Sequence, residues 1–214
     1  AIRSWGRHPD TTSAYLVIVD NMMNLELLFW AAKHGGEEEL FDIAVAHADQ
    51  TLEDHYRPDG SSYHVVEYDP VTGEVLRKRT AQGAADSSAW ARGQAWGLYG
   101  YTMAYRETGY DRYLDQAVEI ADFLLNHPNM PDDGVPYWDH DAPGIPDTYR
   151  DASAAAINAS ALLELGGFVG DSLRDVYRDY ARTTLRTLSQ PPYRADPGEN
   201  ANFLLRHSVG SLPG

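Results

Sequence analysis

The chain has 214 residues, 43% of them hydrophobic, which is enough for one globular core but not for two large ones. Its formal net charge of −15 repels phosphate backbones and anionic membranes, so we exclude nucleic acid and a charged membrane surface as partners. There is no cysteine, which excludes disulfides, thiol nucleophiles and cysteine-ligated zinc.

Three segments are apolar or small on nearly every side, a pattern typical of buried helices. An amphipathic stretch follows each of them after a glycine-containing break, as in a helical hairpin with one buried and one half-exposed helix. The predicted buried helices are 22–32, 89–105 and 152–165. The predicted amphipathic helices are 37–56, 111–126 and 170–188. Their breaks, Gly35-Gly36, Gly109 and Gly166-Gly167, suit helix C-caps.

The amphipathic helices resemble one another, so the hairpins form an internal repeat. Small and large apolar residues recur in them at four-residue spacing, as at Ala44, Ala48 and Leu52. An inner apolar layer and an outer amphipathic layer predict an all-α fold, an (α/α) toroid, with a short β-hairpin over 62–79. Closing such a barrel commonly takes about six hairpins, so we expect residues 1–214 to be a single domain that lacks N- and C-terminal hairpins.

Loops that lead into the inner helices line one mouth of a toroid, so polar residues there are candidates for chemistry. Asp20 follows the apolar run 16–19 at the start of the first inner helix. It is either an N-cap or a general acid. Apolar neighbours would raise its pKa and a helix N-terminus would lower it, and the sequence leaves the balance open.

Arg92 stands inside an otherwise apolar helix, where an unpaired charge is costly. It either forms a structural salt bridge, with Asp86 as the candidate partner, or binds a substrate carboxylate through its planar fork. Trp90 and Trp96 are six residues apart and do not share one helix face, so at least one belongs to the core. His64, in the predicted hairpin, is either a surface histidine or a catalytic one.

Several blocks resemble glycoside hydrolase family 88, the unsaturated glucuronyl hydrolases. They are Asp20-Asn21-Met22-Met23-Asn24-Leu25, the specific block from Ser88 through Arg92-Gly93-Gln94-Ala95-Trp96 to Gly100, Tyr137-Trp138-Asp139, Arg150 to Ala156, and His207 to Gly210. The similarity covers essentially the whole chain. Members of that family extend beyond both ends seen here, and their fold is a six-hairpin α/α barrel.

The resemblance implies that Asp20 is the general acid/base and that His64, Gln82, Arg92 and Trp96 bind the unsaturated uronate or assist catalysis. It assigns packing to Trp90 and places a second important carboxylate on an earlier hairpin, outside this chain. The implied reaction is hydration of the C4=C5 bond that polysaccharide lyases leave in a terminal uronate. One carboxyl can protonate C4 and then, as carboxylate, activate the water that adds at C5.

Family members that prefer sulfated substrates carry Arg where this chain has Ala81, and a serine-rich motif ending in Lys where it has Pro213. Ser208 and Ser211 of that motif are present and are counted as substrate-binding candidates, although both also suit an ordinary loop. Both departures argue against recognition of a sulfate group.

The expected partner is an unsaturated uronate-containing oligosaccharide, with no cofactor and no metal. Alternatives are an unsaturated rhamnogalacturonyl hydrolase and a non-catalytic helical-repeat binding module. No apolar run is long enough for a membrane span and no signal peptide is visible, so a cytoplasmic location is expected. The sequence does not fix the oligomeric state.

Overall fold

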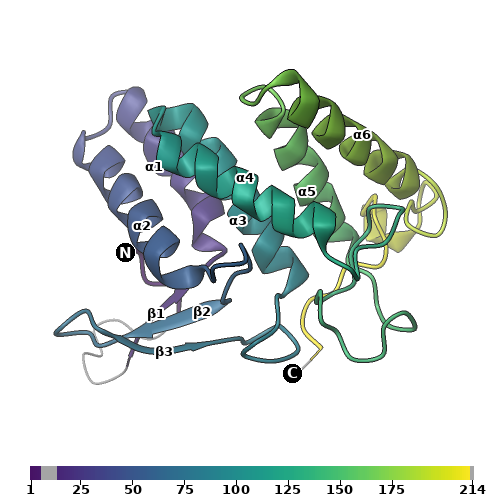
Figure 1. Cartoon of the computed structure of the whole chain (residues 1–214), viewed down its shortest axis with the longest axis horizontal. Helices are drawn as coiled ribbons and strands as arrows, with labels where there is room; N and C mark the ends of the chain where they lie inside the picture. The colour runs from purple at the N-terminus through teal and green to yellow at the C-terminus, as the bar shows by residue number, and fades with distance from the viewer. Residues whose placement is uncertain (6–13, 213–214) are drawn as a thin grey trace.

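A computed structural model describes residues 1–5 and 14–212 of the chain. Its helices form three hairpins (Figure 1), which confirms the predicted repeat. The pairs are α1 (Asn21–Lys33) with α2 (Glu39–His55), α3 (Ala91–Thr108) with α4 (Asp111–Asn126), and α5 (Ala152–Leu165) with α6 (Asp171–Leu188). A short 3-10 turn, η1 (Asn200–Asn202), follows near the end of the chain.

The three inner helices lie side by side in the order α1, α3, α5, and each outer helix packs on its own partner. Leu25, Phe29, Leu98 and Leu162 are fully buried in the main core between these layers. The inner helices approach closely, since a Cβ on Gly100 would lie 2.4 Å from that of Met22. A glycine is therefore needed where α3 crosses α1.

The helix ends follow the predicted glycine breaks with one difference. Gly109 ends α3 in the left-handed conformation, at φ 71°, as a C-cap glycine does. Gly166 ends α5 with an ordinary right-handed φ of −59°, so the left-handed cap expected of a glycine there is not used.

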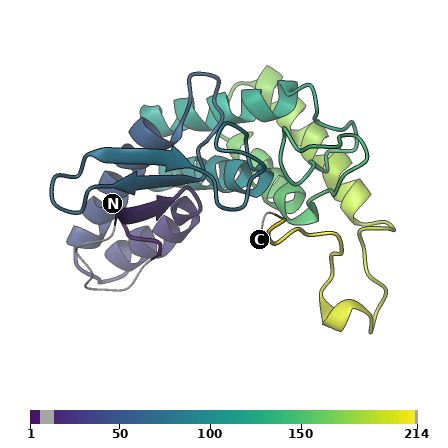
Figure 2. The ribbon, with the colours of Figure 1, turned by 90° about the horizontal axis from the view of Figure 1, so that it is seen from below.

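The predicted β-hairpin is part of a three-stranded antiparallel sheet. Strand β1 (Tyr15–Ile18) pairs with β2 (Val65–Tyr68), which pairs with β3 (Val75–Arg79). Strand β1 was not predicted, because its apolar run has no alternation of polar and apolar residues. The sheet and the long loops lie at the end of the molecule where the inner helices begin, and Figure 2 looks at that end.

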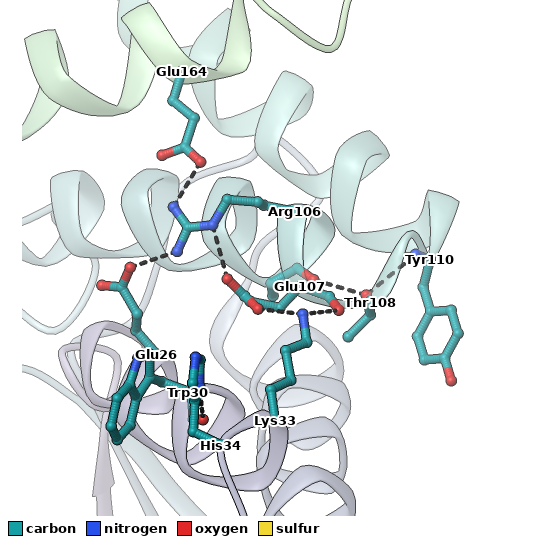
Figure 3. A network of polar contacts seen from close by, with 10 residues as sticks. Glu26, Trp30, Lys33, His34, Arg106, Glu107, Thr108, Tyr110 and Glu164 are labelled. Atoms are coloured by element: carbon teal, nitrogen blue, oxygen red, sulfur yellow. Dashed lines mark hydrogen bonds and ion pairs between the residues drawn. The ribbon is translucent and has the colours of Figure 1, made fainter.

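At the opposite end, a charged network ties the inner helices together (Figure 3). Arg106 of α3 bonds to Glu26 of α1, to Glu164 of α5 at 2.7 Å and to its neighbour Glu107 at 2.9 Å. Lys33 of α1 also pairs with Glu107. One arginine near the end of α3 therefore links that helix to the middle of α1 and to the end of α5.

The prediction that the first inner helix is buried all round is wrong for one face of α1. Leu27 is 68% exposed and Trp30 is 57% exposed. The reason is geometric, because α3 and α2 cover only two sides of α1 in the described part of the chain.

Candidate active site

Asp20 occupies the N-cap position of α1, but its side chain makes no capping hydrogen bond with the described residues. The carboxylate is only 14% exposed, and its Oδ2 atom is buried without a hydrogen-bond partner among those residues. Burial raises the pKa of Asp20 from 3.8 to about 6, against a backbone hydrogen bond and the charge of Arg92, which both lower it. Of the two opposing effects left open by the sequence, burial is the larger.

His64 precedes β2 and is 3% exposed, so the interpretation of it as a surface histidine is wrong. Its Nδ1 accepts hydrogen bonds from the backbone N–H groups of Ala81 at 3.2 Å and Gln82 at 3.3 Å. Its proton therefore lies on Nε2, which faces Asp20 Oδ2 at 3.6 Å. Burial lowers the pKa of His64 to about 3, so the ring is a neutral donor at neutral pH.

Arg92 lies in the first turn of α3 and pairs with Asp151, the N-cap residue of α5, at 2.9 Å. The prediction that Asp86 is the partner of Arg92 is wrong. Asp86 forms an ion pair with Arg77 instead, at 2.9 Å on the surface. Asp86 is close to Arg92 in sequence, whereas Asp151 reaches it because α3 and α5 pack side by side. The Asp151 carboxylate is fully buried and also caps α5, so it holds Arg92 from a fixed point.

The C-terminal segment 207–211 crosses the start of α3 beside these groups. Arg92 donates to the carbonyl oxygen of Val209 and to that of Gly210 at 2.9 Å. The Gln82 side-chain amide also donates to Gly210, at 2.8 Å. Gln82 and Arg92, 10 positions apart in the printed sequence, are thus joined through one carbonyl oxygen.

The two tryptophans differ in their environment. Trp90 is 3% exposed and packs between His64, with ring centroids 4.4 Å apart, and the Arg92 guanidinium, 4.6 Å from its ring. Trp96 lies one turn after Arg92 on the same face of α3 and is partly exposed, with its ring edge-on to Tyr99 at 6.1 Å. A partly open ring beside a polar cluster is suited to stack on a sugar.

Ser208 and Ser211 are both exposed. Ser208 lines a surface depression of about 490 Å³ together with Tyr149, Arg150 and Tyr193. Pro213, the position where some relatives carry Lys, lies outside the described residues. The structure thus brings Asp20, His64, Gln82 and Arg92 into one continuous cluster, and leaves the two serines at its edge.

Two carboxylates of this region received no role from the sequence. Asp139 and Asp151 are both fully buried, and each accepts several hydrogen bonds from its surroundings. A signal was present, since each stands in a block that resembles the family. Within the described residues no group of three or more His, Cys, Asp or Glu side chains could hold a metal ion. No helix there has the length and apolar character of a membrane span.

The cluster contains a carboxyl whose burial raises its pKa to about 6, a neutral imidazole donor and a guanidinium held in place. Comparison with known proteins gives this arrangement a family. No protein-family model matches the chain, but it is 48% identical over 213 residues to the unsaturated glucuronyl hydrolase of Formosa agariphila, covering 100% of this chain and 52% of that one. The chain belongs to the unsaturated glucuronyl hydrolases, glycoside hydrolase family 88.

Solved unsaturated glucuronyl hydrolases have the same fold. A crystal structure of one specific for heparin is 50% identical, with a TM-score of 0.93 over 99% of this chain and 56% of that one. An aspartate-to-asparagine variant of the Streptococcus agalactiae enzyme, complexed with dGlcA-GalNAc6S, is 33% identical, with a TM-score of 0.78 over 91% and 51% of the two chains. The helical layers are thus part of the α/α toroid of these proteins. The chain spans about half the length of the curated relatives it matches.

Proposed function

We propose that this chain carries the acid/base site of a glycoside hydrolase that releases a 4,5-unsaturated uronic acid from the non-reducing end of lyase-generated oligosaccharides. Asp20 is the proposed general acid/base. The observation that carries the proposal is the buried Asp20 carboxyl group, whose pKa is about 6. It lies beside a neutral histidine, His64. An acid with that pKa keeps a protonated fraction at neutral pH and still works as a base after donating its proton.

The proposed reaction starts from the C4=C5 vinyl ether of the substrate. Asp20 transfers its proton to C4, and a water molecule adds to C5 while giving a proton back to the Asp20 carboxylate. The product is a hemiketal at C5, which opens to a ketone at C5 and a hemiacetal at C1. The hemiacetal then breaks its C1–O bond to the second sugar, giving an aldehyde and releasing the rest of the oligosaccharide as an alcohol. A single carboxyl thus returns to its starting state, in contrast to the two-carboxylate arrangement of most glycosidases.

His64 is proposed to orient the reacting groups through its Nε2–H. Asp20 Oδ2 and His64 Nε2 are buried, face each other and lack hydrogen-bond partners in the described part of the chain. Buried polar atoms in that state are uncommon and indicate a place for a further polar group. A substrate or reacting water would satisfy both atoms.

Arg92 is proposed to attract the substrate carboxylate, with Gln82 beside it and Trp96 stacking on a sugar ring. The Asp151 carboxylate and two backbone carbonyl oxygens already accept hydrogen bonds from Arg92. A guanidinium has five N–H groups, so donors remain for a substrate. We expect Arg92 to act mainly through its charge and fixed position, and less as a free bidentate clamp.

The proposed substrate class follows the ligand in the structure of the Streptococcus agalactiae relative, dGlcA-GalNAc6S, in which an unsaturated uronate is joined to a second sugar. Ser208 and Ser211 are proposed contacts for that second sugar, while Ala81 gives no cation for a sulfate. The cytoplasmic location, and the exclusion of nucleic acid as a partner, stay predictions. We propose no metal or cofactor for the reaction.

The test is to mix the full gene product with unsaturated disaccharides and follow the loss of double-bond absorbance. Loss of absorbance with glucuronyl disaccharides supports the proposal, and preferential loss with rhamnogalacturonan products supports the alternative hydrolase. Binding of either substrate without loss of absorbance would identify a helical-repeat binding module. Asp20→Asn serves as the matched inactive variant in each assay.

We also propose that residues 1–214 are one part of a closed barrel, in which a further hairpin covers the exposed face of α1 at Leu27 and Trp30. Apolar surface of this kind promotes association or aggregation in a monomer. The residues 1–214 alone are therefore expected to be inactive and to self-associate, as seen by analytical ultracentrifugation and the absorbance assay. Turnover equal to that of the full gene product would show that the barrel need not close.

A further inference from the structure

Asp139 is a buried carboxylate that contacts the loop between β3 and α3, and the proposed reaction does not use it. Its Oδ2 accepts from the backbone N–H of Ala84 at 2.8 Å and from the hydroxyl of Ser88 at 2.7 Å. Its Oδ1 accepts from the backbone N–H of Asp141 at 2.9 Å. The side chain is fully buried, so these bonds are sheltered from water.

The backbone around Asp139 is itself anchored to the start of α3. Its neighbours exchange backbone hydrogen bonds with that region: His140 N–H donates to Ala89 at 2.9 Å, and Ala91 N–H donates to Trp138 at 3.2 Å. Asp139 thereby joins the start of α3 to the loop 80–88 at a fixed distance. The fit is close, because a Cβ on Gly83 would lie 2.9 Å from Asp139 Oδ2.

The same loop determines which nitrogen of His64 carries the proton. The N–H groups of Ala81 and Gln82 both point at His64 Nδ1, so the proton must occupy Nε2, the atom that faces Asp20. If the loop moved, Nδ1 would lose these donors and could itself take the proton. Nε2 would then become an acceptor, facing a carboxylate that also accepts.

We propose that Asp139 is a positioning residue: it holds the loop 80–88 so that His64 keeps its Nε2–H tautomer and Gln82 stays beside Arg92. This inference rests on the proposed function for its catalytic consequence, but its structural part stands on the hydrogen bonds alone. Asp139 does not touch the proposed reacting atoms, and acts on Asp20 only through the loop and His64.

The variant Asp139→Asn tests this inference with almost no change of shape. The carboxylate accepts on both oxygens, whereas an amide accepts on one side and presents N–H on the other. Asparagine therefore sets an N–H group against either Ala84 N–H or Asp141 N–H. The first contact pushes directly on the loop 80–88, and the second pushes on the segment that holds residue 139 against that loop. Asp147→Asn is the matched control, because it makes the same change on an exposed side chain in the same loop region.

The decisive measurement is the ring ¹⁵N spectrum of His64, which distinguishes the two neutral tautomers, with the signal assigned from a His64→Gln sample. The wild type and Asp147→Asn are expected to show the Nε2–H form, and Asp139→Asn a substantial fraction of the Nδ1–H form. In the full gene product we expect kcat of Asp139→Asn to fall about ten- to a hundredfold with a smaller change in KM, the usual cost of misplacing a reacting group.

A wild-type His64 spectrum and wild-type kcat in a folded Asp139→Asn protein would overturn the inference. If that variant does not fold, Ser88→Ala removes one of the same hydrogen bonds more gently, and a shift toward Nδ1–H that is absent in Asp147→Asn is the expected result. An unchanged His64 spectrum in Ser88→Ala would then reject the inference. If the wild type has no turnover, the proposed function fails, while the tautomer measurement still decides the role of Asp139.

Discussion

The substitution Asp20→Asn is expected to slow turnover strongly while making the folded protein more stable at neutral pH. Burial raises the pKa of Asp20 in the folded state to about 6, whereas an unfolded chain keeps the ordinary value of 3.8. Above pH 6 the carboxylate is ionised in both states, and the folded state bears the cost of holding that charge away from water. Asparagine has nearly the same shape and never bears this charge.

The magnitude follows from the two pKa values. At 1.36 kcal/mol for each pH unit, a pKa of about 6 in place of 3.8 corresponds to about 3 kcal/mol. As the pH falls through 6 toward 4, the folded state takes up the proton before the unfolded state does, so the wild type regains stability. The difference in free energy of unfolding between Asp20→Asn and the wild type should therefore shrink from about 3 kcal/mol near pH 7.5 to about 1 kcal/mol near pH 4.5.

Urea unfolding of the full gene product and of its Asp20→Asn variant at several pH values measures this difference, and the disaccharide assay on the same two proteins measures turnover. We expect kcat to fall by at least about a hundredfold, the usual scale for losing a general acid. Asp147→Asn, on the surface, should change neither quantity. An Asp20→Asn protein that is less stable than wild type, or keeps full activity, would return Asp20 to a purely structural role at the start of α1.

Three further substitutions test other parts of the structure. Arg92→Leu should destabilise the fold by about 3 kcal/mol in urea unfolding, because it leaves the buried Asp151 carboxylate unpaired; a near-neutral effect would contradict the buried pair. Gly97→Ala should cost about 1–3 kcal/mol, since its Cβ would lie 2.1 Å from the Tyr56 hydroxyl oxygen, and less of that cost should appear in a Tyr56→Phe background. Arg106→Gln should lower the free energy of unfolding only slightly, by about 1 kcal/mol or less, because its ion pairs are partly exposed. High salt should erase that difference in urea unfolding.

The helical hairpins could be predicted from the sequence because their signals are local. A helix that is apolar on all sides and an amphipathic neighbour differ within a few turns of chain, and the range 152–165 of the third inner helix agrees with α5. Strand β1 could not be found in this way. It has four residues, and its identity depends on pairing with β2, about 50 positions further along the chain.

The candidate site was predictable in its residue types and much less so in its electrostatics. Asp20 and Arg92 stand out because a charge at the start of an apolar helix, or inside one, needs an explanation. The pKa of Asp20 depends on how deeply the carboxylate is buried, and the partner of Arg92 depends on which inner helix lies next to α3. Both are properties of the packed molecule, and neither is encoded in neighbouring residues.

Asp139 illustrates what sequence spacing leaves out of a site. It lies 75 positions after His64 in the printed sequence, and within the described residues its hydrogen bonds go to other groups, yet the loop it holds contacts His64 directly. The hydrogen bonds made by one ring nitrogen of a histidine determine whether the other carries the proton. Asp139 holds the loop, the loop donates hydrogen bonds to His64 Nδ1, and the proton therefore stays on Nε2, which faces Asp20. Each step is a short contact between segments distant in the chain. Residues that would react with or bind the substrate, such as Asp20, can therefore be recognised in the sequence by their type. Residues that position them, such as Asp139, can be recognised only in the folded structure.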